Sequence, residues 1–183
     1  MHFKTIEQWN EEMWEKVFPV YEHAFAGKGA KPEKIIRNMF RRDIYFLHVG
    51  MLGDRVAAIA LTGELKGIGA LLIDYLAVAE NLQNQGIGRQ MVDCIKEWCL
   101  AEGWFQSIVI ETEVEDTPEN LARIRFWKKC GFTLTDYIHP YIWVPETYRA
   151  MFVKLVPDTD LPENGEDLFK YIGSFHKASY QGA

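Results

Sequence analysis

Apolar residues run almost without interruption through several short stretches of the chain, and this pattern predicts β-strands. The stretches are rich in β-branched and aromatic side chains, which suit a pleated sheet. Gly53 and Asp54 separate two of them and favour a hairpin connection. The predicted strands cover residues 2–4, 44–50, 56–64, 71–78, 107–113, 133–138 and 148–156.

Apolar residues three or four positions apart predict helices in the remaining segments. A stripe over residues 6–21 follows a capping-box pattern at Thr5 and Gln8, and Pro19 inside it predicts a kink or a break. A second helix is expected over residues 32–42, and a third begins at residue 87.

A later helix, over residues 118–130, carries clear signals at both ends. Thr117 is expected to cap it and Pro118 to occupy its first position. Gly131 is expected to end it in the left-handed conformation.

The order of these elements predicts an α/β fold. Strands come first, and a strand-helix-strand-helix-strand region follows, so one sheet combines antiparallel and parallel pairs under helices on its faces. The hydrophobic content of 48% in 183 residues suits one substantial core. We expect a single domain over residues 1–156.

Residues 157–183 form a linker and a further helix. Leu168, Tyr171, Ile172 and Phe175 make a helical stripe that needs a hydrophobic surface to pack on. That surface belongs either to this chain's own sheet or to a partner subunit, so a homodimer is one alternative.

Charge and composition exclude several classes of function. A formal net charge of -6 argues against nucleic-acid binding, which needs many Lys and Arg side chains facing phosphates. Neither a membrane-spanning apolar run nor a signal peptide is visible, which predicts a soluble cytoplasmic protein without membrane partners. The spacing of the 3 cysteines matches no zinc pattern, and no metal is expected.

The segment between the strand at 71–78 and the helix that begins at residue 87 has the character of a phosphate-binding turn. Gly86 and Gly88 allow a ligand to approach the main chain closely. The backbone N–H groups at a helix N-terminus, together with the helix dipole, favour a bound phosphate.

The spacing Gln83-x-x-Gly86-x-Gly88 after a strand resembles the pyrophosphate loop of the GNAT superfamily of N-acetyltransferases. The rival dinucleotide and P-loop patterns fit less well, because Met91 stands where a small residue is required and Gly-Lys-Ser/Thr is absent. The resemblance implies a central, mostly antiparallel sheet with one splayed parallel strand pair, and acetyl-coenzyme A as the co-substrate.

A second block, residues 120–132, supports this resemblance. Asn120, Phe126 and the pair Gly131-Phe132 match the family pattern, in which the Asn hydrogen-bonds the pantetheine arm. Trp127 departs from it, since many members have a Tyr there that protonates the departing thiolate, and an indole N–H cannot act as an acid.

The resemblance implies that backbone and side-chain groups around the turn hold the coenzyme. The expected binding residues are Leu76, Ala77, Val78, Gln83, Asn84, Gln85, Gly86, Ile87, Gly88, Arg89, Asn120 and Trp127. The amide N–H near Leu76 would also polarise the thioester carbonyl in the transition state.

Asp74 is the first candidate for the general base that an acceptor amine requires, because an acid is common in the family at that place. Burial in an apolar strand would raise the pKa of its carboxyl toward neutrality. Alternatively, Asp74 pairs with a nearby cation and has no catalytic role, and Glu111 or Glu113 holds the amine or relays its proton.

With Trp127 in place of Tyr, the general acid could be Tyr137 or Tyr141, although both also suit packing roles. His139 is the one histidine that invites a catalytic interpretation, and surface or core roles suit the others, His176 included. Trp143 and the loop over residues 25–30 are candidates for lining the acceptor pocket.

These features predict an N-acetyltransferase that transfers an acetyl group from acetyl-coenzyme A to a primary amine of a small molecule or peptide. The amine would attack the thioester directly. The alternative is a non-catalytic acyl-coenzyme A-binding sensor with a degenerate site, which the departure at Trp127 favours.

Overall fold

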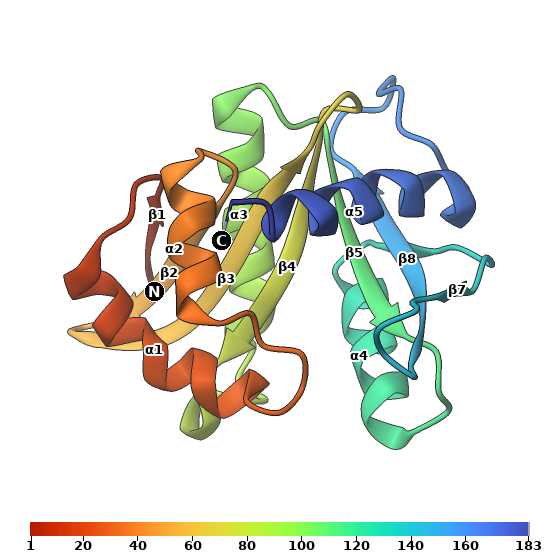
Figure 1. Cartoon of the computed structure of the whole chain (residues 1–183). Coiled ribbons are helices and arrows are strands. Elements are labelled where there is room, and N and C mark those ends of the chain that lie inside the picture. Colours follow the sequence, from red (N-terminus) through yellow and green to blue (C-terminus); the bar gives the residue numbers. More distant parts are fainter. Residues whose placement is uncertain (183) are drawn as a thin grey trace.

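The computed structural model describes residues 1–182 and consists of a twisted sheet between two layers of helices (Figure 1). The strands are β1 (His2–Ile6), β2 (Phe46–Leu52), β3 (Arg55–Leu65), β4 (Ala70–Val78), β5 (Ser107–Glu113), β6 (Thr133–Leu134), β7 (His139–Pro140) and β8 (Thr147–Lys154). The helices are α1 (Glu11–Phe25), α2 (Glu33–Arg41), the short 3₁₀ helix η1 (Glu80–Leu82), α3 (Ile87–Glu102), α4 (Pro118–Lys129) and α5 (Gly165–Ser179).

The sheet mixes the two kinds of strand pairing, as predicted. Its order is β1-β2-β3-β4-β5-β8-β6, and β7 pairs with β8 beyond this path. Within residues 1–182, β4 and β5 form the one parallel pair, and α3 makes the crossover between them. The predicted α/β fold, a mostly antiparallel sheet flanked by helices, is therefore confirmed.

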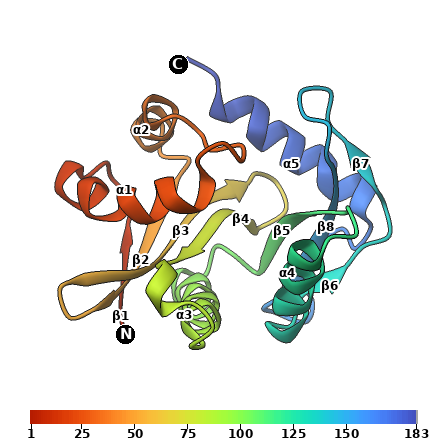
Figure 2. The same cartoon turned by 90° about the horizontal axis from the view of Figure 1, so that it is seen from below.

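The helices divide between the two faces of the sheet. Seen from below in Figure 2, α1, α2 and α5 lie on one side, whereas α3 and α4 lie on the other. Each side has its own hydrophobic core, one including Trp14, Tyr45 and Ile172, and the other Met91 and Ile108. Across residues 1–182, no helix combines the length and apolarity that crossing a bilayer requires.

The strands β4 and β5 stay paired over a short distance only. Their parallel pairing joins Ala70–Leu72 to residues 107–109, and beyond these residues the two strands separate (Figure 1). On the other edge of β4, Tyr75 pairs with Leu61 and Ile73 with Thr62, so Asp74 is the extra residue of a β-bulge.

The predicted start of the first helix was wrong. The side chain of Asn10, not of Thr5, caps α1 by accepting a hydrogen bond of 2.8 Å from the Met13 N–H. Thr5 belongs to β1, which extends to Ile6 because it pairs with β2, and its hydroxyl contacts His48 there. Pro19 lies inside α1, which continues through it to Phe25.

The signals around α4 were read correctly, but the strand after it was predicted too long. The hydroxyl of Thr117 accepts a hydrogen bond from the Asn120 N–H, and Gly131 has a φ of 87°. The strand predicted over residues 133–138 ends at Leu134. The N–H and the hydroxyl of Thr135 both donate to the carbonyl of Ala150 in β8, and Thr135 lies close to Gly165 at the start of α5.

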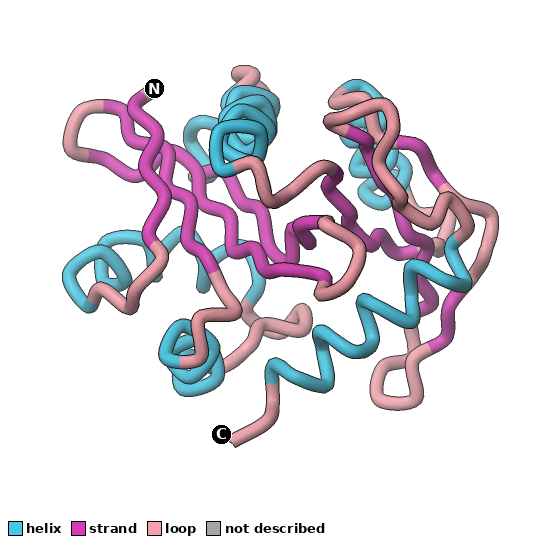
Figure 3. The backbone as a smooth tube through the Cα atoms, turned by 90° about the horizontal axis from the view of Figure 1, so that it is seen from above, coloured by secondary structure: helices cyan, strands magenta, loops and turns pink. Residues whose placement is uncertain are grey.

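The C-terminal helix α5 packs on the sheet of its own chain, and Figure 3 shows it running alongside the sheet toward the C-terminus. The ring of Phe175 occupies the space where a side chain at Gly63 would project. Arg42 at the end of α2 donates a hydrogen bond of 2.6 Å to the carbonyl of Ala178. These contacts bring the tail of the chain onto the face that carries Asp74.

A buried histidine makes the stability of the fold depend on pH. His48 lies between the hydroxyls of Thr5 and Thr62, at 2.9 and 2.8 Å, and is fully buried. Burial lowers the pKa of His48 from 6.5 to about 3. Because the folded-state pKa lies below the unfolded one, its contribution to stability is present above pH 6.5 and is lost as the pH falls toward 3.

We expect the free energy of unfolding of the wild-type protein to fall more steeply below pH 6.5 than that of His48→Gln, by up to about 1.4 kcal/mol per pH unit. Urea unfolding at a series of pH values measures this. His2→Gln, at an exposed position of β1, is the matched control and should keep the wild-type slope. Equal slopes for all three proteins would contradict the prediction.

Candidate active site

The turn between β4 and α3 has backbone N–H groups that form no hydrogen bond within the helix. Gly86 precedes α3 with a φ of 81°, and no side chain caps this helix. The first amide of the helix to form an internal hydrogen bond is that of Gln90, to the Gly86 carbonyl. The amides of Ile87, Gly88 and Arg89 therefore remain available to an anion.

The other residues of this turn shape it. Gln83 and Gln85 donate hydrogen bonds to the carbonyls of Val78 and Asn81, which tie the turn to the end of β4. Asn84 is exposed and adopts a φ of 60°, a conformation that Asn tolerates well. Gly88 lies where a Cβ would touch Phe126 and Val78 at 3.4 Å, so α3, α4 and β4 meet closely here.

The separation of β4 and β5 leaves an edge of β4 that no strand pairs within residues 1–182. Leu76, Ala77 and Val78 lie beyond the last β4–β5 pair, Leu72 with Val109. Backbone groups on that edge are therefore free to bond a ligand lying between the strands.

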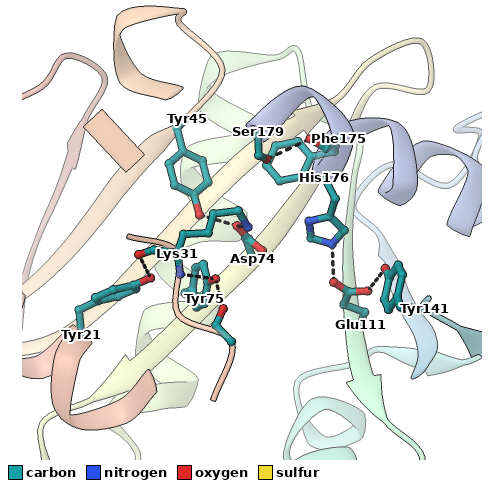
Figure 4. Close-up of polar contacts among 11 residues, drawn as sticks. Tyr21, Lys31, Tyr45, Asp74, Tyr75, Glu111, Tyr141, Phe175, His176 and Ser179 are labelled. Carbon is teal, nitrogen blue, oxygen red and sulfur yellow. Dashed lines mark hydrogen bonds and ion pairs between the residues drawn. The ribbon is translucent and has the colours of Figure 1, made fainter. Parts of the chain in front are cut away.

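Two carboxylates lie on either side of the gap between β4 and β5 beyond Leu72 and Val109, which we call the mouth, and the ring of His176 lies between them (Figure 4). Asp74 and Glu111 each lie two residues beyond the last paired residues, Leu72 and Val109. The alternation of side chains along a strand places Asp74 on the face of Leu72, and Glu111 on the face of Val109. Both faces belong to the core beneath α5.

Asp74 forms a buried ion pair. Its Oδ2 atom lies 2.5 Å from the Lys31 Nζ and 2.5 Å from the hydroxyl of Tyr45, and the side chains of Lys31 and Asp74 are only 4% and 5% exposed. Burial by itself would raise the pKa of the Asp74 carboxyl, but Lys31, His176 and the hydroxyl of Tyr45 outweigh it and hold the pKa below its usual range.

The expected upward shift of the Asp74 pKa was therefore wrong. The expected shift followed from desolvation alone, whereas the structure shows the alternative, in which Asp74 pairs with a nearby cation. A carboxyl held ionised by an ammonium binds a proton weakly, so near neutral pH Asp74 acts first as the partner of Lys31.

Lys31 is held in place by the residues around it. Its backbone carbonyl accepts a hydrogen bond of 3.0 Å from Tyr21, and its N–H donates one of 3.1 Å to the hydroxyl of Tyr75. Tyr75 also donates to the carbonyl of Gly29. The end of the loop before α2 is thus fixed to β4.

Glu111 belongs to a second hydrogen-bonded group. Its Oε1 atom lies 2.6 Å from Nε2 of His176 on α5, and its Oε2 atom accepts a hydrogen bond of 2.6 Å from the hydroxyl of Tyr141. Burial, followed by the charge of Glu111, raises the pKa of Tyr141 far above its usual value. Tyr141 is thus a fixed hydrogen-bond donor rather than an acid.

Several residues predicted from the sequence lie apart from these carboxylates. The amide of Asn120 donates to the Glu115 carbonyl, and Trp127 is 6% exposed, packed between Phe126 and Phe132. Tyr137 packs on Phe169 of α5.

Tyr141 is the tyrosine that contacts Glu111. His139 stacks on Phe169 with ring centroids 4.2 Å apart. Trp143 stacks on Tyr141 and is 64% exposed, which places it beside the mouth.

Three residues that meet here were not predicted as site residues: Lys31, Tyr45 and His176. Lys31 and Tyr45 meet Asp74 only through contacts distant in the sequence, and no local pattern marks them. His176 did carry a signal, because it follows Leu168 and Ile172 at steps of four and therefore lies on the packed side of α5.

Among residues 1–182, no three His, Cys, Asp or Glu side chains are grouped so that they could hold a metal ion.

The geometry of the sheet and turn agrees with the comparisons to known proteins. Residues 4–132 match the acetyltransferase (GNAT) family. This match spans well over half of the chain, which therefore belongs to the GNAT family of acetyltransferases. No curated protein sequence matches the chain.

Solved structures with similar folds are distant in sequence. A protein of the GNAT family from Bacteroides thetaiotaomicron has a TM-score of 0.70 and 17% identity, covering 97% of this chain and 95% of its own. An aminoglycoside 6'-N-acetyltransferase complexed with coenzyme A has a TM-score of 0.68 and 12% identity, covering 87% of this chain and 100% of its own. A Salmonella typhimurium protein solved with its cofactor acetyl-coenzyme A has a TM-score of 0.65 and 16% identity, covering 89% and 99%.

We expect Asp74→Asn to lower the free energy of unfolding by about 3–5 kcal/mol, because it leaves the ammonium of Lys31 buried without its counter-ion. Urea unfolding at pH 7 measures the loss. The double variant Lys31→Met/Asp74→Asn should recover part of the stability, since the uncompensated charge is gone. A single variant as stable as wild type would mean that this ion pair does not hold the loop on β4.

Proposed function

We propose that the protein is an N-acetyltransferase that moves the acetyl group of acetyl-coenzyme A onto a primary amine of a small molecule or peptide. The observation that carries this proposal is the combination of unpaired amides at residues 87–89 with the separation of β4 and β5 next to them. Membership of the GNAT family and the coenzyme found in similar folds support it.

The residues of the turn suit the diphosphate of the coenzyme. The amides of Ile87, Gly88 and Arg89 would donate to its oxygens, and the exposed side chain of Arg89 adds positive charge. The pantetheine arm would then follow the unpaired edge of β4 at residues 76–78 toward Asp74 and Glu111. An amide near Leu76 would stabilise the negative charge that develops on the thioester oxygen.

The mouth between the strands suits an amine as acceptor. Glu111 supplies a carboxylate there, since Asp74 is already paired with Lys31, and Tyr141 and Trp143 supply aromatic faces, which together attract an ammonium group. We propose that water protonates the leaving thiolate, because Trp127 has no usable proton and Tyr137 packs against α5.

The test is release of the coenzyme A thiol from acetyl-coenzyme A in the presence of amines, amino acids, polyamines and peptides. Release that depends on one acceptor supports the enzyme. Thermal stabilisation by acetyl-coenzyme A without release across the whole panel would instead indicate the non-catalytic acyl-coenzyme A sensor.

Asn84→Asp should weaken the binding of coenzyme A by roughly tenfold, since it adds a negative charge beside the diphosphate in an exposed turn. Asp tolerates the left-handed conformation of this residue, so the turn itself should be preserved. Isothermal titration calorimetry measures the dissociation constant, and the difference should shrink as salt is added. Gln106→Glu, an exposed change outside the turn, is the control. Equal affinity of both variants at low salt would place the diphosphate elsewhere.

A further inference from the structure

The C-terminal helix places an imidazole in the mouth between β4 and β5. Figure 4 shows the ring of His176 between the side chains of Asp74 and Glu111, with the nitrogen that does not contact Glu111 turned toward Asp74. This residue lies outside residues 4–132, the part of the chain that matches the family. We propose that His176 is the base that accepts the proton of the acceptor amine, through its Nδ1 atom, with Glu111 and Tyr141 as positioning residues. The proposal rests on the proposed function.

The hydrogen bonds of Glu111 determine which nitrogen of His176 is available. An ionised carboxylate only accepts hydrogen bonds, and Oε1 of Glu111 lies 2.6 Å from Nε2 of the ring. In the neutral ring the proton therefore sits on Nε2, and Nδ1 carries the lone pair. The hydrogen bonds among residues 1–182 include none to this Nδ1 atom.

The neighbouring carboxylates are worse placed to take a proton. Oδ2 of Asp74 is engaged by Lys31 and Tyr45, and the pKa of this carboxyl lies below its usual range. Both oxygens of Glu111 are engaged, one by His176 and one by Tyr141. An imidazole titrates near neutral pH in general, which suits a base that must alternate between its two forms.

The position of the ring is set by contacts on either side of it in α5. Phe175 packs against Gly63 of β3, and Arg42 donates to the carbonyl of Ala178. The titratable and charged groups around His176 are Glu111 of β5, Asp74 of β4, Lys31 and Tyr45 beside Asp74, Tyr141 and His139 of the segment that contains β7, and Lys177 of α5 itself.

The proton balance of the reaction gives this base two tasks. The acceptor arrives mostly as an ammonium ion, and Nδ1 takes one proton from it and passes it to solvent. The neutral nitrogen then bonds to the carbonyl carbon of the thioester, and the carbon–sulfur bond breaks as sulfur leaves with the electron pair. Nδ1 accepts the second N–H proton and passes it to a water molecule, which protonates the thiolate. The products are the N-acetyl amine, the coenzyme A thiol and one proton in solvent.

The first experiment compares His176→Gln with wild type, using the amine of the panel that gives the fastest thiol release. We expect kcat/KM for the amine to fall by about 10²- to 10⁴-fold, with the affinity for coenzyme A unchanged. The acid limb of the wild-type pH profile should disappear, because the variant has no imidazole at this position to be protonated. His2→Gln should keep both the rate and this limb, and Tyr141→Phe should show a smaller fall in rate with the limb retained. An acid limb that persists in His176→Gln would overturn the proposal while leaving the acetyltransferase intact.

The second experiment needs neither a variant nor an acceptor. ¹⁵N NMR of the wild-type protein saturated with coenzyme A reports which nitrogen of His176 carries the proton above its pKa. A proton on Nε2, with Nδ1 titrating, supports the proposal, and a proton on Nδ1 would overturn it even if His176→Gln failed to fold. Absence of thiol release with every amine would instead refute the proposed function itself.

Discussion

The short pairing between β4 and β5 is the constraint on which the site depends. Parallel strands that stayed paired along their whole length would use the backbone N–H and C=O groups of their facing edges in hydrogen bonds to each other. No such group would remain for a ligand. Here the pairing stops at Leu72 and Val109, and the strands separate toward the turn before α3. The same separation leaves an edge of β4 unpaired next to the turn before α3. It also places Asp74 of β4 and Glu111 of β5 on either side of the mouth. The proposed binding surface and the candidate chemical groups thus share one structural cause.

The bulge at Asp74 adds a second consequence of the same region. It turns both Asp74 and Tyr75 toward the face covered by α1, α2 and α5. Asp74 there meets Lys31 and Tyr45, and Tyr75 holds the loop before α2. These contacts fix the loop before α2 beside the mouth. The charge of Asp74 is compensated by Lys31 before any ligand binds.

Local chemistry made much of the fold predictable. Thr117, Pro118 and Gly131 bounded α4 as expected, because capping depends on residues within one turn of the helix end. The strand Ser107–Glu113 lies where it was predicted, and it contains a β-branched apolar run at residues 108–110. The start of α1 was not predictable in this way, because Thr5 joins β1 only through its pairing with β2.

The part of the candidate site that is formed by backbone groups was predictable from the sequence, and the part formed by side chains was not. The glycine turn carries its own signature, whereas Asp74 pairs with Lys31, 43 residues away, and Glu111 contacts His176, 65 residues away. No periodicity reports which distant side chains meet, so the direction of the Asp74 pKa and the place of His176 required the structure.

The most direct test of this account is a crystal structure of the protein with coenzyme A. We expect the diphosphate on the amides of residues 87–89 and the pantetheine arm along residues 76–78, with its sulfur beside the imidazole of His176. Coenzyme A bound on another surface, with the strands around the mouth closed and these amides facing water, would contradict it.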